Sequence, residues 1–155
     1  MFHYFEMVKR LNPAAFVMEN VPGILAMEGG DVIEGLVKKF KGLGYKNTNY
    51  MLLNAADFGA PQIRKRAFIV GSKSEIPIEA PVKTHGSKED LKNNPILLPH
   101  LTLIDAIDDL PTIRTGSITS STDDYLPRSN PFQAEMRKKS DKVRSRNNKE
   151  HSSRN

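Results

Sequence analysis

Cysteine is absent from this 155-residue chain. Its absence excludes a disulfide framework, a thiolate zinc site and a cysteine nucleophile within these residues. Long apolar runs are missing too, since no stretch approaches the roughly 20 residues that a membrane-spanning helix requires. Residues 1–6 lack the basic start and apolar stretch of a secretion signal. We therefore expect a cytoplasmic (or nucleoid-associated) chain with neither a membrane nor a metal as partner.

Acidic and basic residues nearly balance until the last part of the chain. Residues 1–126 hold 14 Lys or Arg against 15 Asp or Glu, whereas residues 127–155 hold 9 against 3. Clustered cations release counterions from a phosphate backbone, which makes this segment a candidate for binding double-stranded DNA. The candidate residues are Arg137, Lys138, Lys139, Arg144 and Arg146. A disordered, solvated tail has the same composition, and the sequence leaves that alternative open.

Helical and strand-like patterns alternate along the first part of the chain. Apolar residues recur at helical spacing over 2–11 and again over 30–42. Short apolar runs at 14–18, 50–53 and 67–71 predict strands, and the first has the pattern of a strand buried on both faces. This alternation is typical of an α/β domain with a mainly parallel sheet.

Prolines interrupt the pattern after Ser72, and the later part of the chain is mostly irregular. A short helix is predicted over 102–110, where Thr102 can cap the first turn. Residues 114–124, rich in Ser, Thr and Asp, predict an exposed loop. A further helix is predicted around 131–142, although it has little apolar surface to bury.

The first group of candidate functional residues is Glu19-Asn20-Val21-Pro22-Gly23, at the carboxyl end of the first predicted strand. In open α/β sheets, ligands bind at that end of the strands. A carboxyl group there, beside apolar side chains, is expected to be desolvated and able to donate a proton to a ring nitrogen. A glutamate that merely caps the next turn is the alternative.

The second group lies about forty residues later, where Gln62, Arg64 and Arg66 alternate along a segment that enters the last predicted strand. Side chains two residues apart project from the same side of a strand. An arginine fork suits phosphates or a base carbonyl, which need paired donors. A solvated, cationic strand end would show the same spacing.

Together, and in this order, the two groups resemble the Glu-Asn-Val and Gln-x-Arg-x-Arg motifs of the cytosine-C5 DNA methyltransferase family. Residues 58–66, Phe-Gly-Ala-Pro-Gln-Ile-Arg-Lys-Arg, are close to the family's usual wording. Residues 104–111 resemble the family's link toward target recognition. The resemblance implies the C-terminal portion of a Rossmann-like class I methyltransferase sheet, as a partial catalytic domain over 1–111. An irregular basic extension over 112–155 would begin the target-recognition region.

The resemblance also implies a reaction, in which a methyl group passes from S-adenosylmethionine to carbon 5 of a cytosine in DNA. In the family a cysteine thiolate adds to carbon 6 and makes carbon 5 nucleophilic, and the base is flipped out of the duplex. Glu19 matches the glutamate that hydrogen-bonds or protonates N3. Arg66 matches the arginine near O2, with Arg64 as its neighbour. Asn20 and Gln62 match supports of the base pocket.

Two segments that the family carries ahead of its Glu-Asn-Val motif do not occur in the residues before Glu19: the Phe-x-Gly-x-Gly loop for the methyl donor and the Pro-Cys-Gln segment that carries the nucleophile. We therefore expect the chain alone to be inactive and to need a complementing methyltransferase chain or segment. A non-catalytic DNA-binding remnant and a decayed reading frame are the alternatives. Lone histidines are usually structural or solvated, and none of the four matches a catalytic position of the family: His3, His85, His100 and His151.

Overall fold

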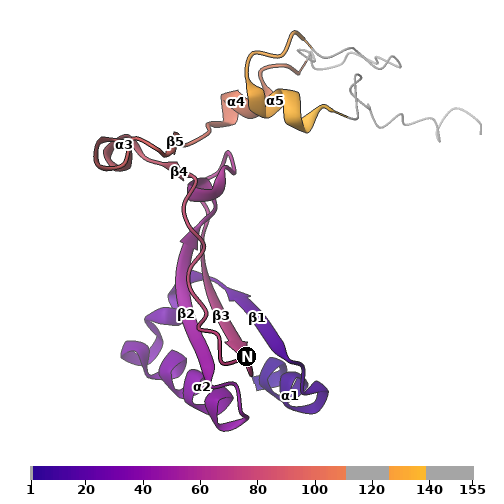
Figure 1. The fold of residues 1–155 in the computed structure, drawn as a ribbon, viewed down its shortest axis with the longest axis vertical. Helices are drawn as coiled ribbons and strands as arrows, with labels where there is room; N and C mark the ends of the chain where they lie inside the picture. The colour runs from indigo at the N-terminus through magenta and orange to yellow at the C-terminus, as the bar shows by residue number, and fades with distance from the viewer. Residues whose placement is uncertain (1, 111–125, 139–155) are drawn as a thin grey trace, which may run out of the picture. The chain divides into compact units, whose positions relative to one another are not determined.

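The computed structural model describes residues 2–110 and 126–138 (Figure 1). The chain divides into two compact units, Met1–His100 and Leu101–Asn155. The predicted boundary between a catalytic and a recognition region, at 111/112, lies outside the described residues and stays a prediction. None of the helices in the described ranges is long and apolar enough to cross a membrane.

Helices and strands alternate in the first unit, which confirms a mixed α/β fold. Its longer helices are α1 (Phe2–Leu11) and α2 (Asp31–Gly42). Its longer strands are β1 (Ala15–Asn20), β2 (Asn47–Asn54) and β3 (Lys65–Ser72). Three 3-10 turns connect them: η1 (Pro22–Leu25), η2 (Met27–Gly30) and η3 (Ala55–Phe58). The predicted helices and strands therefore form, within a few residues of the expected bounds.

The prediction of a mainly parallel sheet is wrong for these strands. Their order is β1-β3-β2, and β3 is antiparallel to both neighbours. A parallel neighbour needs a crossover of a dozen or more residues, whereas only η3 and a short irregular segment join β2 to β3. The crossover that the pattern indicated does exist, because α2 lies between β1 and β2, which point the same way. The returning β3 occupies the place between them.

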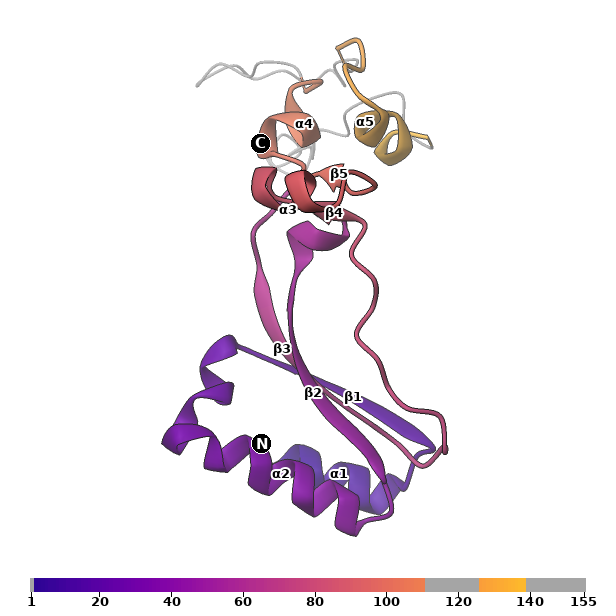
Figure 2. The ribbon, with the colours of Figure 1, turned by 60° about the vertical axis from the view of Figure 1, so that its left-hand side comes forward.

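One face of this sheet carries the hydrophobic core. Helices α1 and α2 lie side by side against it, with the Phe5 and Phe40 rings 5.2 Å apart (Figure 2). Phe16 of β1 stacks on Phe40 at 4.1 Å and meets Tyr45 edge-on at 5.1 Å. The buried core comprises Val8, Phe16, Met18, Ile24, Ile33, Leu36, Phe40, Tyr45, Ala67 and Ile69. Apolar burial of this kind stabilises the unit by about 25 cal/mol per Å².

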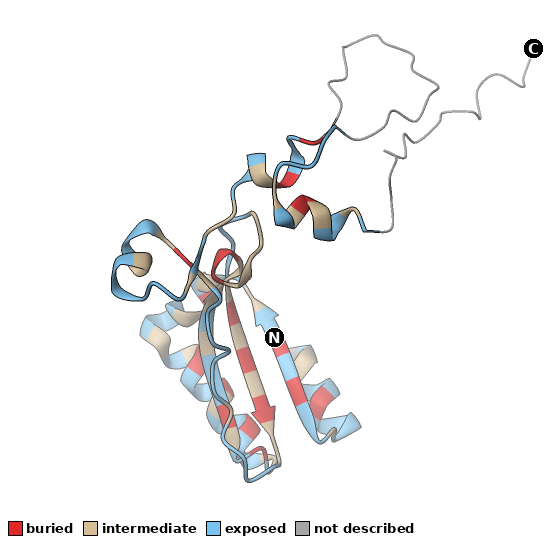
Figure 3. Ribbon diagram, turned by 45° about the horizontal axis from the view of Figure 1, so that its top comes forward, coloured by how far each residue is buried: buried red, intermediate tan, exposed pale blue. Residues whose placement is uncertain are grey.

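The opposite face of the sheet, called the open face below, is only partly covered. It includes Val17, Glu19, Met51, Arg66, Phe68 and Val70. Buried and exposed positions alternate along β1 (Figure 3), and Val17 is 60% exposed. The prediction that this strand is buried on both faces is therefore wrong for the described residues, because helices pack on one face alone.

Gly71 allows Phe16 to reach its place in the core. The two residues are register partners, and a Cβ built on Gly71 would lie 2.2 Å from Phe16 Cε1. The ring cannot retreat, because Phe40 and Tyr45 hold it. We expect Gly71→Ala to lower the free energy of unfolding by about 1–3 kcal/mol through overpacking.

Gly35 of α2 is the matched control, since a Cβ there meets nothing within 4 Å. Gly35→Ala should raise the free energy of unfolding by about 0.5–1 kcal/mol, because alanine loses less entropy in a helix. Urea unfolding followed by circular dichroism measures both variants. A Gly71→Ala variant as stable as the parent would contradict this account of the core.

A smaller substructure follows the sheet within the first unit. Strands β4 (His85–Gly86) and β5 (Leu98–Pro99) pair in parallel, and α3 (Lys88–Asn93) lies between them in the chain. Ser87 caps α3 in a capping box with Asp90, whose carboxylate accepts from the Ser87 N–H at 2.8 Å. The chain then continues from His100 into the second unit.

The described part of the second unit is a pair of short helices, α4 (Leu103–Ile107) and α5 (Pro131–Met136). Thr102 caps α4, as predicted, and Asn130 caps α5. The helix predicted over 102–110 is therefore confirmed in a shorter form. The predicted loop at 114–124 lies outside the described residues, as does the end of the helix predicted over 131–142. The packing between α4 and α5 is polar, with Asp109 and Gln133 buried.

Candidate functional site

Glu19 and Arg66, which the sequence placed in separate motifs, meet on the open face. The register pairs Glu19 with Phe68, so Arg66, two residues before Phe68, projects from the same face. Arg66 Nε lies 2.7 Å from Glu19 Oε1. Arg66 Nη1 also donates to the Lys65 carbonyl oxygen at 2.8 Å. The antiparallel return of β3 beside β1 thus creates a carboxylate–guanidinium pair at the end of the sheet.

The Glu19 carboxylate is accessible from the open face. Its side chain is 49% exposed, and Oε2 has no hydrogen-bond or ion-pair partner among the described residues. The desolvated, apolar surrounding that we expected is therefore not formed by these residues alone. One carboxylate oxygen is held by Arg66 and the other can meet a ligand.

The remaining predicted pocket residues flank this pair along the chain. Asn20 Oδ1 accepts from the Val21 N–H at 2.8 Å, which shapes the turn after β1. Gln62 and Arg64 are exposed and precede the first residue of β3, so only Arg66 of the three lies in the strand. The Arg64 N–H donates to Asn54 Oδ1 at 3.0 Å. This hydrogen bond fixes the backbone of the segment while the two side chains face solvent.

Comparison with known proteins gives the family. A family model described as C-5 cytosine-specific DNA methylase matches residues 1–155. The chain belongs to this family. It is 41% identical over 110 residues to the Type II methyltransferase M.BspRI of Lysinibacillus sphaericus, covering 70% of this chain and 24% of that protein.

Two further relatives carry similar names. The chain is 36% identical over 138 residues to the Type II methyltransferase M.DdeI of Desulfomicrobium norvegicum, which covers 87% of the chain and 32% of the relative. It is 36% identical over 119 residues to M.AquIA of a Picosynechococcus strain, which covers 70% of the chain and 48% of the relative. This methylase-family chain thus spans about a quarter to a half of its relatives' length.

The structure gives protein partners to the two candidate DNA-binding residues that it describes. Arg137 Nη2 lies 3.2 Å from Oδ1 of the buried Asp109, and the Arg137 side chain is 16% exposed. Lys138 is exposed and forms an ion pair with Glu135. Arg137 therefore holds α5 against the end of α4 in this methylase-family chain. Lys139, Arg144 and Arg146 lie outside the described residues, so their assignment to DNA stays a prediction.

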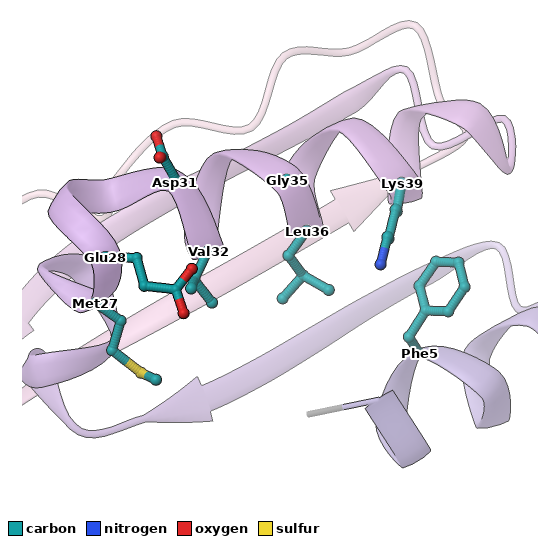
Figure 4. A pocket seen from close by; sticks show the side chains of 8 residues that line it. All are labelled: Phe5, Met27, Glu28, Asp31, Val32, Gly35, Leu36 and Lys39. Atoms are coloured by element: carbon teal, nitrogen blue, oxygen red, sulfur yellow. The ribbon is translucent and has the colours of Figure 1, made fainter.

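A cavity of about 480 Å³ opens between α1 and α2, away from Glu19 and Arg66. Figure 4 shows Leu36 and Lys39 of α2 pointing toward Phe5 of α1, while Asp31 points away. Its lining is largely apolar, and no cluster of three or more metal-ligating side chains occurs in residues 2–110 and 126–138. Three charged residues also line it, Glu28, Asp31 and Lys39, but none of them belongs to the two motifs of the family resemblance.

Asp57, Lys83 and His100 form a polar cluster that the sequence did not reveal. Asp57 Oδ2 lies 2.8 Å from Lys83 Nζ, and its Oδ1 lies 2.9 Å from His100 Nε2. Asp57 directly precedes residues 58–66, which carry the family resemblance, but its partners come from an irregular stretch without periodicity. His100 had been expected to be structural or solvated, and it is an internal partner of a buried carboxylate.

Proposed function

We propose that this chain supplies part of the cytosine pocket of a DNA (cytosine-5-)-methyltransferase. The observation that carries the proposal is the 2.7 Å pair of Glu19 and Arg66, two residues that match the family's base-binding motifs. The first unit would be the C-terminal portion of a Rossmann-like methyltransferase sheet. Residues 112–155 would begin the target-recognition region, and the names of the relatives favour a role in DNA modification within a restriction–modification system.

The chemistry of the reaction explains why these two groups are needed. When a thiolate adds to carbon 6 of cytosine, negative charge develops on N3 and O2 of the ring. Glu19 would hold a proton at N3, and the Arg66 guanidinium would donate to O2. Donors that are already in place when the charge develops stabilise the transition state more than the ground state. The methyl group itself comes from S-adenosylmethionine in this family.

The residues of this chain do not fit a complete methyl-donor site or a complete catalytic centre. There is no cysteine to form the thiolate, and the glycine loop that the family carries ahead of Glu-Asn-Val does not occur in the residues before Glu19. Residues 40–44, Phe-Lys-Gly-Leu-Gly, have the same spacing, but they end α2 and bury Phe40 in the core. No such loop lines the α1–α2 cavity, nor a second cavity of about 470 Å³ that Asp57 lines. We therefore assign no step of donor binding to these residues, and we expect the chain alone to transfer no methyl group.

A complementing polypeptide, or a further segment of the same one, would supply the missing groups. The open face supports this, because Val17 is largely exposed and Phe68 and Val70 are only partly covered. Exposed apolar side chains gathered on one surface are typical of an interface. The partly covered face also borders the Glu19–Arg66 pair, where a thiolate would have to approach the base.

A chimera tests the proposed function. Residues 2–110 of this chain would replace the matching segment of M.BspRI, leaving the rest of that protein to supply the thiolate and the donor loop. Methyl transfer from labelled S-adenosylmethionine to DNA is measured for the chimera and for the isolated chain. We expect transfer by the chimera alone. Transfer by the isolated chain would refute the proposed division of the active site, and a folded but inactive chimera would refute the proposed pocket.

Double-stranded DNA is the proposed partner of the basic tail. Deleting residues 139–155 removes six Lys or Arg and two Asp or Glu. We expect the deletion to weaken DNA binding and to flatten its dependence on salt, because fewer counterions are released. Fluorescence anisotropy at several salt concentrations measures both effects.

Arg137→Ala is the matched comparison for the tail deletion. It removes one cation from the same region, but one that is bonded to Asp109. This variant should destabilise the α4–α5 pair and leave the salt dependence nearly unchanged. An unaltered salt dependence after the tail deletion would show that the tail does not bind DNA.

A further inference from the structure

Asp57 lies at the centre of a set of contacts on the η3 turn, between β2 and the segment that carries Gln62 and Arg64. Asp57 is buried, with 8% of its surface exposed. Lys83 Nζ and His100 Nε2 approach its two carboxylate oxygens at 2.8 and 2.9 Å. The Thr84 N–H donates to the Asp57 carbonyl oxygen at 3.0 Å. A carboxylate this buried is stable only where cations or donors compensate its charge.

A second contact presses the same turn from outside. Gly59 ends η3 with a φ of +85°, a left-handed conformation that favours glycine. The ring of His85 lies against it, since a Cβ built on Gly59 would be 2.8 Å from His85 Cε1. Residues in and around β4 and β5 therefore contact η3 and its end at two positions. Lys83 and His100 contact Asp57, and His85 contacts Gly59.

Asn54 connects the η3 turn to the Gln-x-Arg-x-Arg segment. Asn54 Nδ2 donates to Asp57 Oδ1 at 3.4 Å, and Asn54 Oδ1 accepts from the Arg64 N–H at 3.0 Å. The Ala55 N–H donates to the Arg64 carbonyl oxygen at 3.0 Å. The backbone N–H and carbonyl oxygen of Arg64 are thus held by Asn54, the last residue of β2, and Ala55, the first residue of the turn that contains Asp57.

We propose that Asp57 is a positioning residue that sets the course of residues 62–66 through Asn54, with Lys83 and His100 holding its carboxylate in place. Its importance for catalysis rests on the proposed function, because residues 62–66 include the candidate base-binding arginines. His100 directly precedes the second unit in the chain. The contacts from His100 through Asp57 and Asn54 to Arg64 therefore link the last residue of the first unit to the backbone of residues 62–66.

The contacts of the Asp57 carboxylate with Lys83 and His100 depend on pH, because they require the carboxylate to be charged. Desolvation by burial raises the pKa of Asp57, but hydrogen bonds and charges from Lys83 and His100 outweigh it, and the net pKa is lowered. A lowered pKa means that the stabilising contribution is present above the ordinary value, about 3.9, and is lost as pH falls through the folded value. Lys65 and Asp90 line the same cavity of about 470 Å³.

Hydrogen exchange of backbone amides in the 155-residue chain tests the proposal without any need for activity. In Asp57→Asn, we expect the protection factors of the Arg64 and Ala55 amides to fall about tenfold or more. Protection of the Ile69 amide in the core should change less than about twofold. Asp90→Asn is the matched control, because Asp90 lines the same cavity but caps α3 and should leave Arg64 and Ala55 protected.

Further variants keep the test decisive if Asp57→Asn does not fold. His100→Phe should lower protection of the same two amides, whereas His100→Gln, which keeps a donor, should restore it. In the unaltered chain, their protection relative to Ile69 should fall as the pH drops below about 3.9. Unchanged protection of Arg64 and Ala55, or a loss no larger than that of Ile69, would overturn the proposal. An inactive chimera would bear on the proposed function and would leave these exchange results standing.

Discussion

Replacing Glu19 with Gln in the M.BspRI chimera is expected to lower the rate of methyl transfer about 10²–10⁴-fold, the range typical of a lost general acid or base. Glutamine has nearly the same shape, but its amide cannot release a proton to N3. Single-turnover transfer of labelled methyl groups into DNA measures the rate. A variant that keeps more than about a tenth of the parent's rate would contradict the role of Glu19.

Stability measurements separate this catalytic effect from a folding effect. The Glu19–Arg66 pair involves a half-exposed carboxylate, and exposed ion pairs contribute only about 0–1 kcal/mol. The Glu19→Gln chimera should therefore unfold at nearly the temperature of its parent. Glu28→Gln is the matched control, since Glu28 lines the α1–α2 cavity and should leave the rate unchanged.

Arg66→Met is expected to lower the rate of methyl transfer by about 10²–10³-fold, as when a donor to a developing anion is removed. The Arg66 guanidinium pairs with Glu19 through Nε, and its remaining N–H groups would donate to the base oxygen O2. Arg66→Lys should recover only part of the rate, because an ammonium group cannot hold two partners in the fixed geometry of the fork.

Lys65→Met is the control for Arg66, because it removes a neighbouring cation whose side chain projects from the other side of β3. The rate with Lys65→Met should stay near that of the parent. If Arg66→Met and Lys65→Met lower the rate equally, general electrostatic attraction to DNA, rather than contact with the base, explains the effect.

The sequence singled out Glu19 and Arg66 through the family resemblance of two separate motifs, and the structure brings their side chains within 2.7 Å of each other. Their contact with the base stays a prediction. The sequence also predicted the helices and strands around these two residues, since apolar periodicity reports burial. It did not predict that β3 runs antiparallel between β1 and β2. The alternation of apolar residues is the same in a parallel and an antiparallel strand. The direction of β3 depends instead on the short connection through η3.

Two other features could not be predicted from local patterns. Val17 lies in a continuous apolar run, which indicated burial on both faces, but burial depends on which helices pack against the sheet. Asp57 and His100 are 43 positions apart, and no repeat or spacing connects them. Such a contact follows from the path of the chain through β4 and β5, which only the tertiary structure shows.

The central claim is that Glu19 and Arg66 bind the target cytosine together. A crystal structure of the chimera bound to DNA that contains its target site tests this claim most directly. We predict a flipped cytosine with N3 within hydrogen-bonding distance of the Glu19 carboxyl group and O2 within reach of the Arg66 guanidinium. A flipped cytosine held by other residues, with the Glu19–Arg66 pair intact and remote from the base, would contradict the account.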